Sequence, residues 1–302
     1  MSNHTNIWII HNPAAGWCTR RRVKKLLTAF ASRGIMPIVK PTLHPGHAIA
    51  LAAEACRTGA SIIVAAGGDG TLNEVINGML ASGLTNKLPL LAVFPVGTVN
   101  LVARELNVPS CPDTFAARVL TRANTATIWP AQANGRYFVA VAGVGIDAYV
   151  VNSVSLLKKK LFSRFAYVYE TIKTLIKATY TARGWPHRYT VEIDGHSYHT
   201  PALIVAKGHY YAGRFVVANQ ARLTDQQLYA VLFASGTIRS LASYIFHLAC
   251  GRLNQHRQVT VLPANSILIH GPVGQPVQLD GDPGGRLPLL IEVGTVPLTV
   301  VY

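Results

Sequence analysis

The chain has 302 residues, which is enough for two domains that each bury a hydrophobic core. Half of the residues are hydrophobic and only 14% are charged, which excludes an intrinsically disordered protein. Lysine and arginine outnumber the acids by 28 to 13, and the resulting net charge of +15 predicts a polyanionic partner such as nucleic acid, an anionic lipid headgroup or a nucleotide.

We expect neither a signal peptide nor a membrane-spanning helix, because no basic segment precedes the first apolar stretch and no apolar run reaches about 18 residues. The four cysteines lie far apart and form no C-x-x-C pair. They are predicted to be buried free thiols in a reducing compartment rather than zinc or redox ligands.

The N-terminal part alternates strands with helices. A strand is expected over 6–10, a helix after the turn 12–16, a second strand over 35–39 and a helix over 47–56. Such βα alternation predicts a parallel sheet that binds its ligand at the carboxyl ends of the strands. The basic cluster 20–25 on the first helix is either a solvated face or a contact for phosphates or an anionic membrane.

The most informative stretch is 62–78. An apolar strand breaks into Gly67, Gly68 and Gly70 around Asp69, and helical spacing then resumes. Glycines let a backbone approach a ligand closely, and the first amides of the next helix favour a phosphate. Because a carboxylate would repel a phosphate, Asp69 implies Mg²⁺ between them. A plain strand-to-helix connection is the alternative.

A second loop of the same kind follows the strand expected over 88–94. It carries Gly97, Thr98 and Asn100 before another helix. Two such loops at neighbouring strand ends predict one shared ligand.

Near Ile128 the pattern changes to short strands and turns, which predicts a domain boundary. The first domain is expected over 1–127, and the second, an antiparallel sandwich or barrel, over 128–302. The last strand can return to the first domain.

The second domain carries an insertion over 152–180 that is basic, aromatic and amphipathic. It either packs on the core or docks on a bilayer surface. In the β-rich part, strands are expected over 137–141, 189–193, 198–206 and 287–301. An Asp280-Gly281-Asp282 turn follows another strand, over 277–279.

These motifs together resemble the diacylglycerol kinase catalytic family, which includes bacterial lipid kinases and sphingosine kinases and is distantly related to NAD kinases. The resemblance is carried in order by Asn12-Pro13-x-x-Gly16, the run 67–74, Gly97-Thr98-x-Asn100 with Ala103 and Arg104, the segment 143–148, and the turn 280–282. It implies an α/β fold, with a βα nucleotide-binding domain followed by a C-terminal β-sandwich domain.

The resemblance also implies the cofactors ATP and Mg²⁺ and a set of site residues. Asp282 would be the general base for a lipid hydroxyl and Asp69 would position Mg²⁺. A structural Mg²⁺ would bind the Asp225 carboxylate and the carbonyls of Arg222 and Gln227, although a simple Asx turn is equally expected there. Nucleotide contacts would come from Asn12, Thr42, Gly67, Gly68, Asp69, Gly70, Thr71, Leu72, Asn73 and Thr98.

The sequence departs from the family at two positions. Leu101 stands where the family has an aspartate, and we expect Asp147 to take over its role in the charge network. Asp282 replaces a glutamate and is one methylene shorter, so it must approach the acceptor more closely or act through water.

The expected function is transfer of the γ-phosphate of ATP to a lipid such as diacylglycerol, a sphingoid base or phosphatidylglycerol, at the inner face of the membrane by a cytoplasmic, peripherally bound protein. The alternatives are an NAD kinase-like phosphotransferase with a polar acceptor, and a non-catalytic protein that binds nucleotide and membrane. No nucleic acid partner is expected, because charge alone supports one. The choice of acceptor and the presence of a homodimer stay open.

Overall fold

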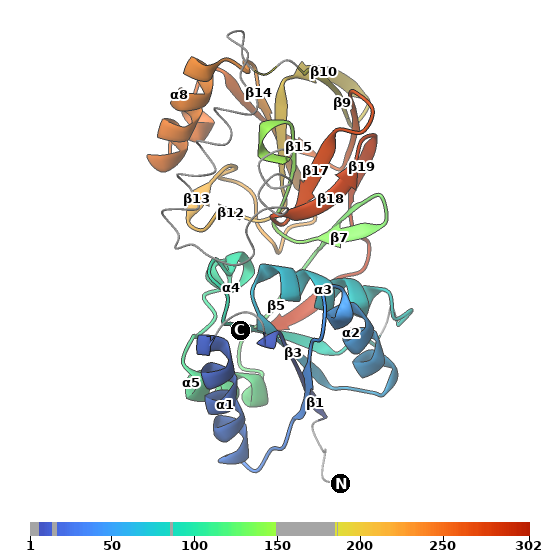
Figure 1. Cartoon of the computed structure of the whole chain (residues 1–302), viewed down its shortest axis with the longest axis vertical. Coiled ribbons are helices and arrows are strands. Elements are labelled where there is room, and N and C mark those ends of the chain that lie inside the picture. Colours follow the sequence, from blue (N-terminus) through green and yellow to red (C-terminus); the bar gives the residue numbers. More distant parts are fainter. Residues whose placement is uncertain (1–5, 14–16, 85–86, 149–184, 186) are drawn as a thin grey trace. The chain divides into compact units, whose positions relative to one another are not determined.

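The computed structural model describes residues 6–13, 17–84, 87–148, 185 and 187–302 (Figure 1). The chain divides into two compact units, each described by itself. Unit 1 contains Met1–Pro130, Leu223–Asp225 and Gly294–Tyr302, and unit 2 contains the remainder. The insertion expected over 152–180 and Gly16 lie outside the described residues.

Unit 1 is built on a single six-stranded sheet. Its strands are β1 (Ile7–His11), β2 (Ile38–Pro41), β3 (Ile62–Gly67), β4 (Leu90–Pro95), β5 (Thr125–Ile128) and β20 (Leu298–Val301). Their order is β2-β1-β3-β4-β20-β5, and all neighbouring pairs are parallel except β20 with β5. The chain's last strand therefore lies beside β4, and β3 is buried along its whole length as expected for a strand covered on both faces.

Helices cover both faces of this sheet (Figure 1). They are α1 (Trp17–Ala31), α2 (His47–Arg57), α3 (Asp69–Leu80), α4 (Leu101–Glu105) and α5 (Pro112–Thr121). One core joins α1 and α5 to alternate residues of the central strands, with Phe30, Phe94 and Phe115 as its largest members. The other face is covered by α2 and α3, which pack closely because a Cβ on Gly78 would lie 2.2 Å from the Ile49 carbonyl oxygen.

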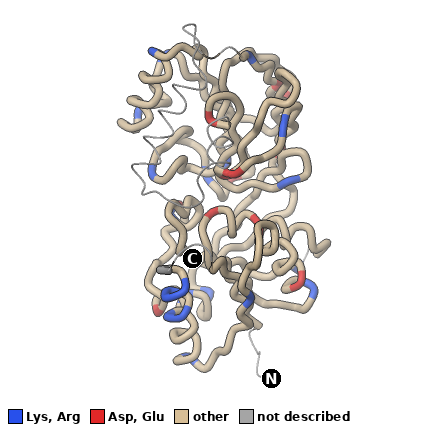
Figure 2. Tube along the Cα trace, in the orientation of Figure 1, with Lys and Arg blue, Asp and Glu red and all other residues tan. Residues whose placement is uncertain are grey.

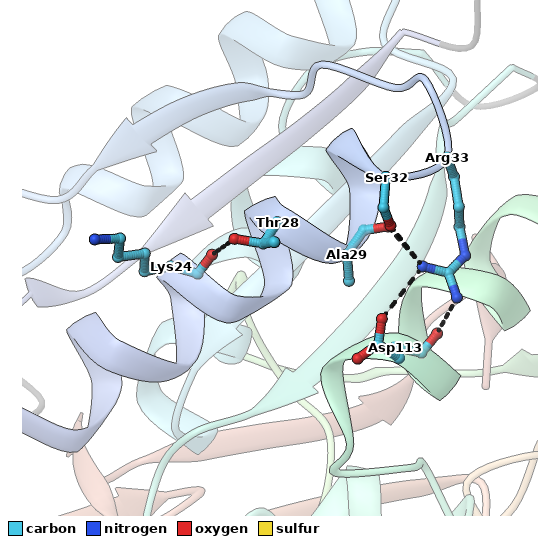
Figure 3. Close-up of polar contacts among 6 residues, drawn as sticks. All are labelled: Lys24, Thr28, Ala29, Ser32, Arg33 and Asp113. Atoms are coloured by element: carbon cyan, nitrogen blue, oxygen red, sulfur yellow. Dashed lines mark hydrogen bonds and ion pairs between the residues drawn. The ribbon is translucent and has the colours of Figure 1, made fainter.

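A polar contact at the surface also joins α1 to α5 (Figure 3). Arg33 follows the end of α1, and its guanidinium donates to the Asp113 carboxylate at 3.4 Å and to the Asp113 carbonyl at 3.3 Å. Within α1 the Thr28 hydroxyl donates to the Lys24 carbonyl at 3.2 Å. The ion pair is largely solvated, so its contribution to stability is small, at most about 1 kcal/mol. The apolar core beneath it holds the two helices.

Unit 2 consists chiefly of two six-stranded sheets. One has the order β10-β9-β16-β19-β6-β7 and the other the order β15-β14-β11-β8-β17-β18, and every neighbouring pair in both is antiparallel. The strands β12 and β13 form a small separate ribbon, which is antiparallel as well. The elements are β6 (Ala131–Ala133), β7 (Arg136–Phe138), β8 (Val141–Val144), β9 (Tyr189–Ile193), β10 (His196–Thr200), β11 (Ala202–Ala206), β12 (Tyr210–Tyr211), β13 (Phe215–Val216), β14 (Leu228–Phe233), α8 (Ile238–Ala249), β15 (Val259–Ala264), β16 (Ser266–His270), β17 (Pro276–Leu279), β18 (Asp282–Arg286) and β19 (Leu289–Val293).

The two sheets share one apolar core, to which both contribute alternate residues such as Val191 and Ile267 from one and Leu203 and Ala230 from the other. A second cluster lies where α8 covers the sheet that contains β14. The predicted fold class, an α/β unit with a parallel sheet followed by an antiparallel β-sandwich, is confirmed.

Three predicted strands are each divided in the structure. The stretch 137–141 contains β7 and β8, which belong to different sheets, because the Asp280 carboxylate accepts the amides of Val139 and Ala140 between them. The stretch 198–206 divides at Pro201, which has no amide to donate to a ladder. The stretch 287–301 contains β19 in unit 2 and β20 in unit 1. In each case a tertiary contact or a proline interrupts an apolar run.

Two further expectations concern side chains and the membrane. Among the described cysteines Cys56 is buried, but Cys111 and Cys250 are exposed, so the prediction of buried thiols is wrong for these two. In the described part of the chain, no helix combines the length and the hydropathy needed to cross a bilayer.

Candidate functional site

The first loop of the candidate site connects β3 to α3 through Gly68. The side chain of Thr71 packs over Gly67, where an added Cβ would lie 2.3 Å from the Thr71 Cβ. Glycine is therefore required at position 67 by packing. The first helical bond of α3 runs from the Leu72 amide to the Gly68 carbonyl at 3.1 Å, so the amides of Gly70 and Thr71 have no acceptor within the helix.

The second loop follows β4 and lies directly against the first. β3 and β4 pair in parallel with Gly67 opposite Pro95, and the amides of Val96 and Gly97 both donate to the Gly67 carbonyl at 3.2 Å. An added Cβ on Gly97 would lie 2.4 Å from the Cα of Gly68. The two loops therefore meet at glycines, which brings their backbones closer than any larger residue would allow.

Asp69 connects the two loops. Its Oδ2 accepts the Asn100 amide at 2.8 Å and its Oδ1 accepts the Leu101 amide at 2.7 Å. Asn100 has a left-handed backbone with φ of 53°, and its side chain bonds Gly97 through both of its polar atoms. Asp69 thus holds the start of α4. A carboxylate oxygen can accept more than one hydrogen bond or ligand, so this role does not exclude a cation at Asp69.

Leu101 contributes to this arrangement through its backbone. The side chain that replaces the expected aspartate is buried, while its amide donates to Asp69. The contact between the loops therefore does not depend on an acid at position 101.

Three other predicted nucleotide contacts lie in unit 1. Asn12 follows β1, and the Thr42 amide after β2 donates to the His11 carbonyl at 2.8 Å. Thr98 lies exposed in the second loop. Since β2, β1, β3 and β4 are neighbours in that order, the structure brings these residues and the run Gly67–Asn73 to one edge of the sheet.

The side chains within that run differ in their roles. Thr71, Leu72 and Asn73 are buried, so they offer a ligand little besides their backbone. Glu74, which ends the motif, accepts the amides of Gly46 and Ala48 at 2.8 and 3.1 Å and so caps the start of α2. Sequence reasoning assigned Glu74 no separate role, because its partners lie far from it in the chain.

Two basic side chains near this edge have partners or surroundings that the sequence did not indicate, since it placed Arg22 only in the basic cluster 20–25 and gave His11 no role. Arg22, from the basic cluster on α1, donates to the carbonyls of Pro95 and Ser110 at 2.6 and 2.8 Å, so it supports the second loop. At the end of β1, the buried Nδ1 of His11 has no hydrogen-bond partner within the described residues. Burial, assisted by the charge of Arg20, lowers the pKa of His11 and favours its neutral form.

Unit 2 carries the predicted general base. Asp280 and Gly281 both have positive φ, at 51° and 83°, and form the two-residue turn between β17 and β18. The Asp280 carboxylate accepts the amides of three consecutive residues, 139–141, at 2.8 to 3.1 Å. It therefore has a structural role, while Asp282 begins β18 and is only partly buried.

A second carboxylate supports the same turn. Asp147 accepts hydrogen bonds from the Tyr211 hydroxyl and from the side-chain Nε2 of Gln278, the latter at 2.7 Å. The side-chain Oε1 of Gln278 in turn accepts the backbone amide of Gly281 at 2.8 Å. Burial raises the pKa of Asp147, although the two hydrogen bonds oppose that rise. Asp147 is therefore linked through the Gln278 side chain to the turn that precedes Asp282.

The three residues predicted to bind a structural metal have other partners. The Arg222 carbonyl accepts the ammonium of Lys207, a fully buried side chain, at 2.9 Å. The Asp225 carboxylate is exposed and accepts the Thr224 hydroxyl at 3.2 Å, and the Gln227 side chain donates to the Ala264 carbonyl. Since an ammonium already lies on the Arg222 carbonyl, these residues do not fit a dedicated cation site, and we derive no step through a metal there.

The glycine loops do fit a phosphate group with a loosely held cation. Their close approach and the first amides of α3 form a cradle for an anion. Within the described residues, no three His, Cys, Asp or Glu side chains cluster in a way that could hold a metal. A Mg²⁺ ion that accompanies a nucleotide needs only one or two carboxylates, because phosphates and water supply its other ligands.

The fold and these loops define a class of phosphate-transferring protein, and comparison with known proteins identifies the family. Residues 6–133 match the diacylglycerol kinase catalytic domain, and residues 140–302 match the YegS C-terminal NAD kinase beta sandwich-like domain. The chain belongs to the diacylglycerol kinase family and is an ATP-dependent lipid kinase by class.

Relatives match along most of the chain. The diacylglycerol kinase of Bacillus subtilis (strain 168) is 27% identical over 93% of this chain and 90% of its own length. That of Staphylococcus haemolyticus (strain JCSC1435) is 29% identical over 93% and 83%. A crystal structure of a diacylglycerol kinase from Bacillus anthracis str. Sterne shares the fold, with a TM-score of 0.77 at 24% identity over 100% of this chain and 98% of that one.

Proposed function

We propose that this protein transfers the γ-phosphate of ATP to a hydroxyl of a membrane lipid, with diacylglycerol, a sphingoid base or phosphatidylglycerol as the candidate acceptors. The observation that carries the proposal is the contact of the two glycine loops at the start of α3, held by Asp69. The relatives named diacylglycerol kinase support the lipid acceptor.

In the proposed reaction the amides of Gly70 and Thr71 and the hydroxyl of Thr98 bind the phosphates, and Asn12 and Thr42 border the nucleotide. Asp69 holds the second loop and would hold Mg²⁺ there, directly or through water. When bound, Mg²⁺ neutralises charge on the phosphates. Such catalysis consists mainly of positioning and charge stabilisation, so the preformed contact between the loops is the chain's chief contribution.

Asp282 accepts the proton of the acceptor hydroxyl. The hydroxyl oxygen forms the new bond to the γ-phosphorus, the bond from that phosphorus to the β–γ bridging oxygen breaks, and ADP leaves with the electron pair. Asp147 and Gln278 position the turn that carries Asp282.

A lipid acceptor lies in a membrane. We therefore propose that this protein is cytoplasmic and associates with the membrane peripherally.

The proposal is tested by measuring transfer from labelled ATP to extracted lipids with purified Asp69→Ala and Asp282→Ala. Loss of a general base lowers kcat by about 10² to 10⁴-fold, and we expect a loss at least as large for Asp69 because it also holds the second loop. Asp113→Ala is the matched control, since this exposed acid takes part only in the surface pair with Arg33.

Turnover like that of the unmodified protein in either variant would remove that residue from the mechanism. The same assay with NAD as acceptor separates the alternatives. Transfer to NAD and to no lipid would replace the proposed acceptor class, and tight ATP binding without any transfer would indicate a non-catalytic protein.

A further inference from the structure

The side of helix α8 that faces the sandwich is mixed, because the Tyr244 ring and Leu248 pack in the second apolar cluster beside several hydroxyl groups. Among its residues, Ser240 and Tyr244 are the buried ones. The Tyr244 hydroxyl bonds the amide and the carbonyl of Ser235, both at 3.2 Å, and the Ser240 hydroxyl donates to that of Ser235 at 3.0 Å. Further along, the Ser243 hydroxyl bonds His256 at 2.9 Å. Hydroxyl groups therefore hold the inner face of α8 together with the apolar packing of Tyr244 and Leu248.

The outer side of the same helix is apolar. Ile238 is 49% exposed, Ile245 43% and Phe246 65%. At about 100° per residue these three positions, together with Ala242 and Ala249, fall within roughly 100° of the helix circumference. We call these five residues the α8 outer face. Since an isolated domain normally turns such a face inward, its exposure indicates a binding surface.

All charged Asp, Glu, Lys and Arg residues in the part of the sequence around α8 are basic. No Asp or Glu occurs over residues 226–279, which contain Arg239, Arg252 and Arg257. All three arginines are exposed, and Figure 2 shows basic but no acidic positions on α8. An apolar helix face flanked by arginines matches the surface of a bilayer that contains anionic lipids, where apolar side chains enter the interface and cations meet headgroups.

We propose that the α8 outer face docks the protein onto an anionic bilayer. The inference rests on the proposed function, because a lipid kinase must reach an acceptor held in a membrane, and it names the surface that makes the contact. A second copy of the chain fits less well as the occupant, since pairing through this face would bring like arginines together with no acid in 226–279 to balance them.

The test uses the full chain and vesicle flotation, with phosphatidylcholine alone or mixed with phosphatidylglycerol. The double variant Ile245→Ser with Phe246→Ser removes two of the large apolar side chains, and we expect its bound fraction on mixed vesicles to fall about tenfold or more. Arg239→Gln should weaken binding to mixed vesicles only. Val273→Ser is the matched control, because Val273 is fully exposed and belongs to the connection between β16 and β17, not to α8.

Binding of the double variant equal to that of the unmodified protein would overturn the proposal. So would a decrease in oligomer size in the double variant, measured by light scattering, because it would assign the face to a second copy. Turnover of a short-chain acceptor dispersed in water should be unchanged in the double variant while turnover in vesicles falls. Absence of lipid turnover in the unmodified protein would reject the proposed function, yet flotation would still decide the docking surface.

Discussion

The helices α3 and α8 are both twelve residues long and both amphipathic, yet of the two only α8 leaves large apolar side chains exposed. α3 buries its apolar residues, among them Val75, Ile76 and Met79, and leads the glycine loop that we assign to phosphate binding. α8 buries Ser240 and Tyr244 and exposes its apolar side. The comparison shows that a helical period identifies two faces but does not decide which one meets the core.

The difference follows from what each helix packs against. α3 lies between β3 and α2, with Gly78 close to the backbone of α2, so apolar contact is available on its inner side. The ring of Tyr244 on α8 lies 5.0 Å from those of Phe233 and His256, and its hydroxyl finds partners in the loop before the helix. Hence the inner side of α3 should determine stability, while the outer side of α8 should determine binding.

The largest expected effect is a difference in stability between a substitution on the apolar face of α3 and one on the apolar face of α8. Ile76→Ala removes a fully buried side chain from α3 and should lower the free energy of unfolding by about 2–5 kcal/mol. Ile245→Ala on α8 is the matched change at an exposed position and should lie within about 0.5 kcal/mol of the unmodified protein. Urea denaturation of both variants measures this. Equal destabilisation would mean that the outer side of α8 is covered.

An intermediate effect concerns the polar inner side of α8. Tyr244→Phe keeps the ring but removes the hydroxyl that bonds Ser235, and should cost about 1 kcal/mol because partly buried backbone partners lose a bond. In Tyr229→Phe, the control, the hydroxyl removed has no hydrogen-bond partner among the described residues. If thermal unfolding gives the same midpoint for both variants, the hydroxyl contacts do not hold α8.

The smallest expected effect is a pH dependence at the same contact. Burial, and then the charges of His247 and Arg257, hold the pKa of His256 below its ordinary value of 6.5. As the pH falls through 6.5 the unfolded chain takes up a proton that the folded protein does not, so stability decreases until the lowered pKa is reached. Above pH 6.5 this histidine contributes nothing to the pH dependence.

The measurement is the unfolding midpoint across this pH range for the unmodified protein and His256→Gln. The variant should show a shallower decrease at low pH, and the difference should be smaller than the effect of Tyr244→Phe because His256 is close to solvent. His270→Gln changes an exposed histidine and serves as the control. If the plots of unfolding midpoint against pH run parallel for all three proteins, the proposed contribution of His256 to the pH dependence is wrong.

Much of the candidate site could be predicted because it depends on local backbone chemistry. The glycines around Asp69 predict a strand, a close approach and a helix, and the structure has β3, Gly68 and α3 in those places. Similarly, Asp194 and Gly195 predict a hairpin turn, and both have positive φ between β9 and β10. The roles of Glu74 and Arg22 could not be predicted, since their partners lie 26 to 88 residues away.

The sequence by itself determined the order of the elements, the glycine loops and the family, because these depend on residue types within a few positions of one another. Only the tertiary structure decided that the oxygens of Asp69 bind the amides of Asn100 and Leu101, that Lys207 reaches the Arg222 carbonyl, and that α8 turns its apolar side outward. The physical reason is that a charge or an apolar side chain takes its partner from whatever the fold brings near it, and neighbours in sequence do not specify that partner.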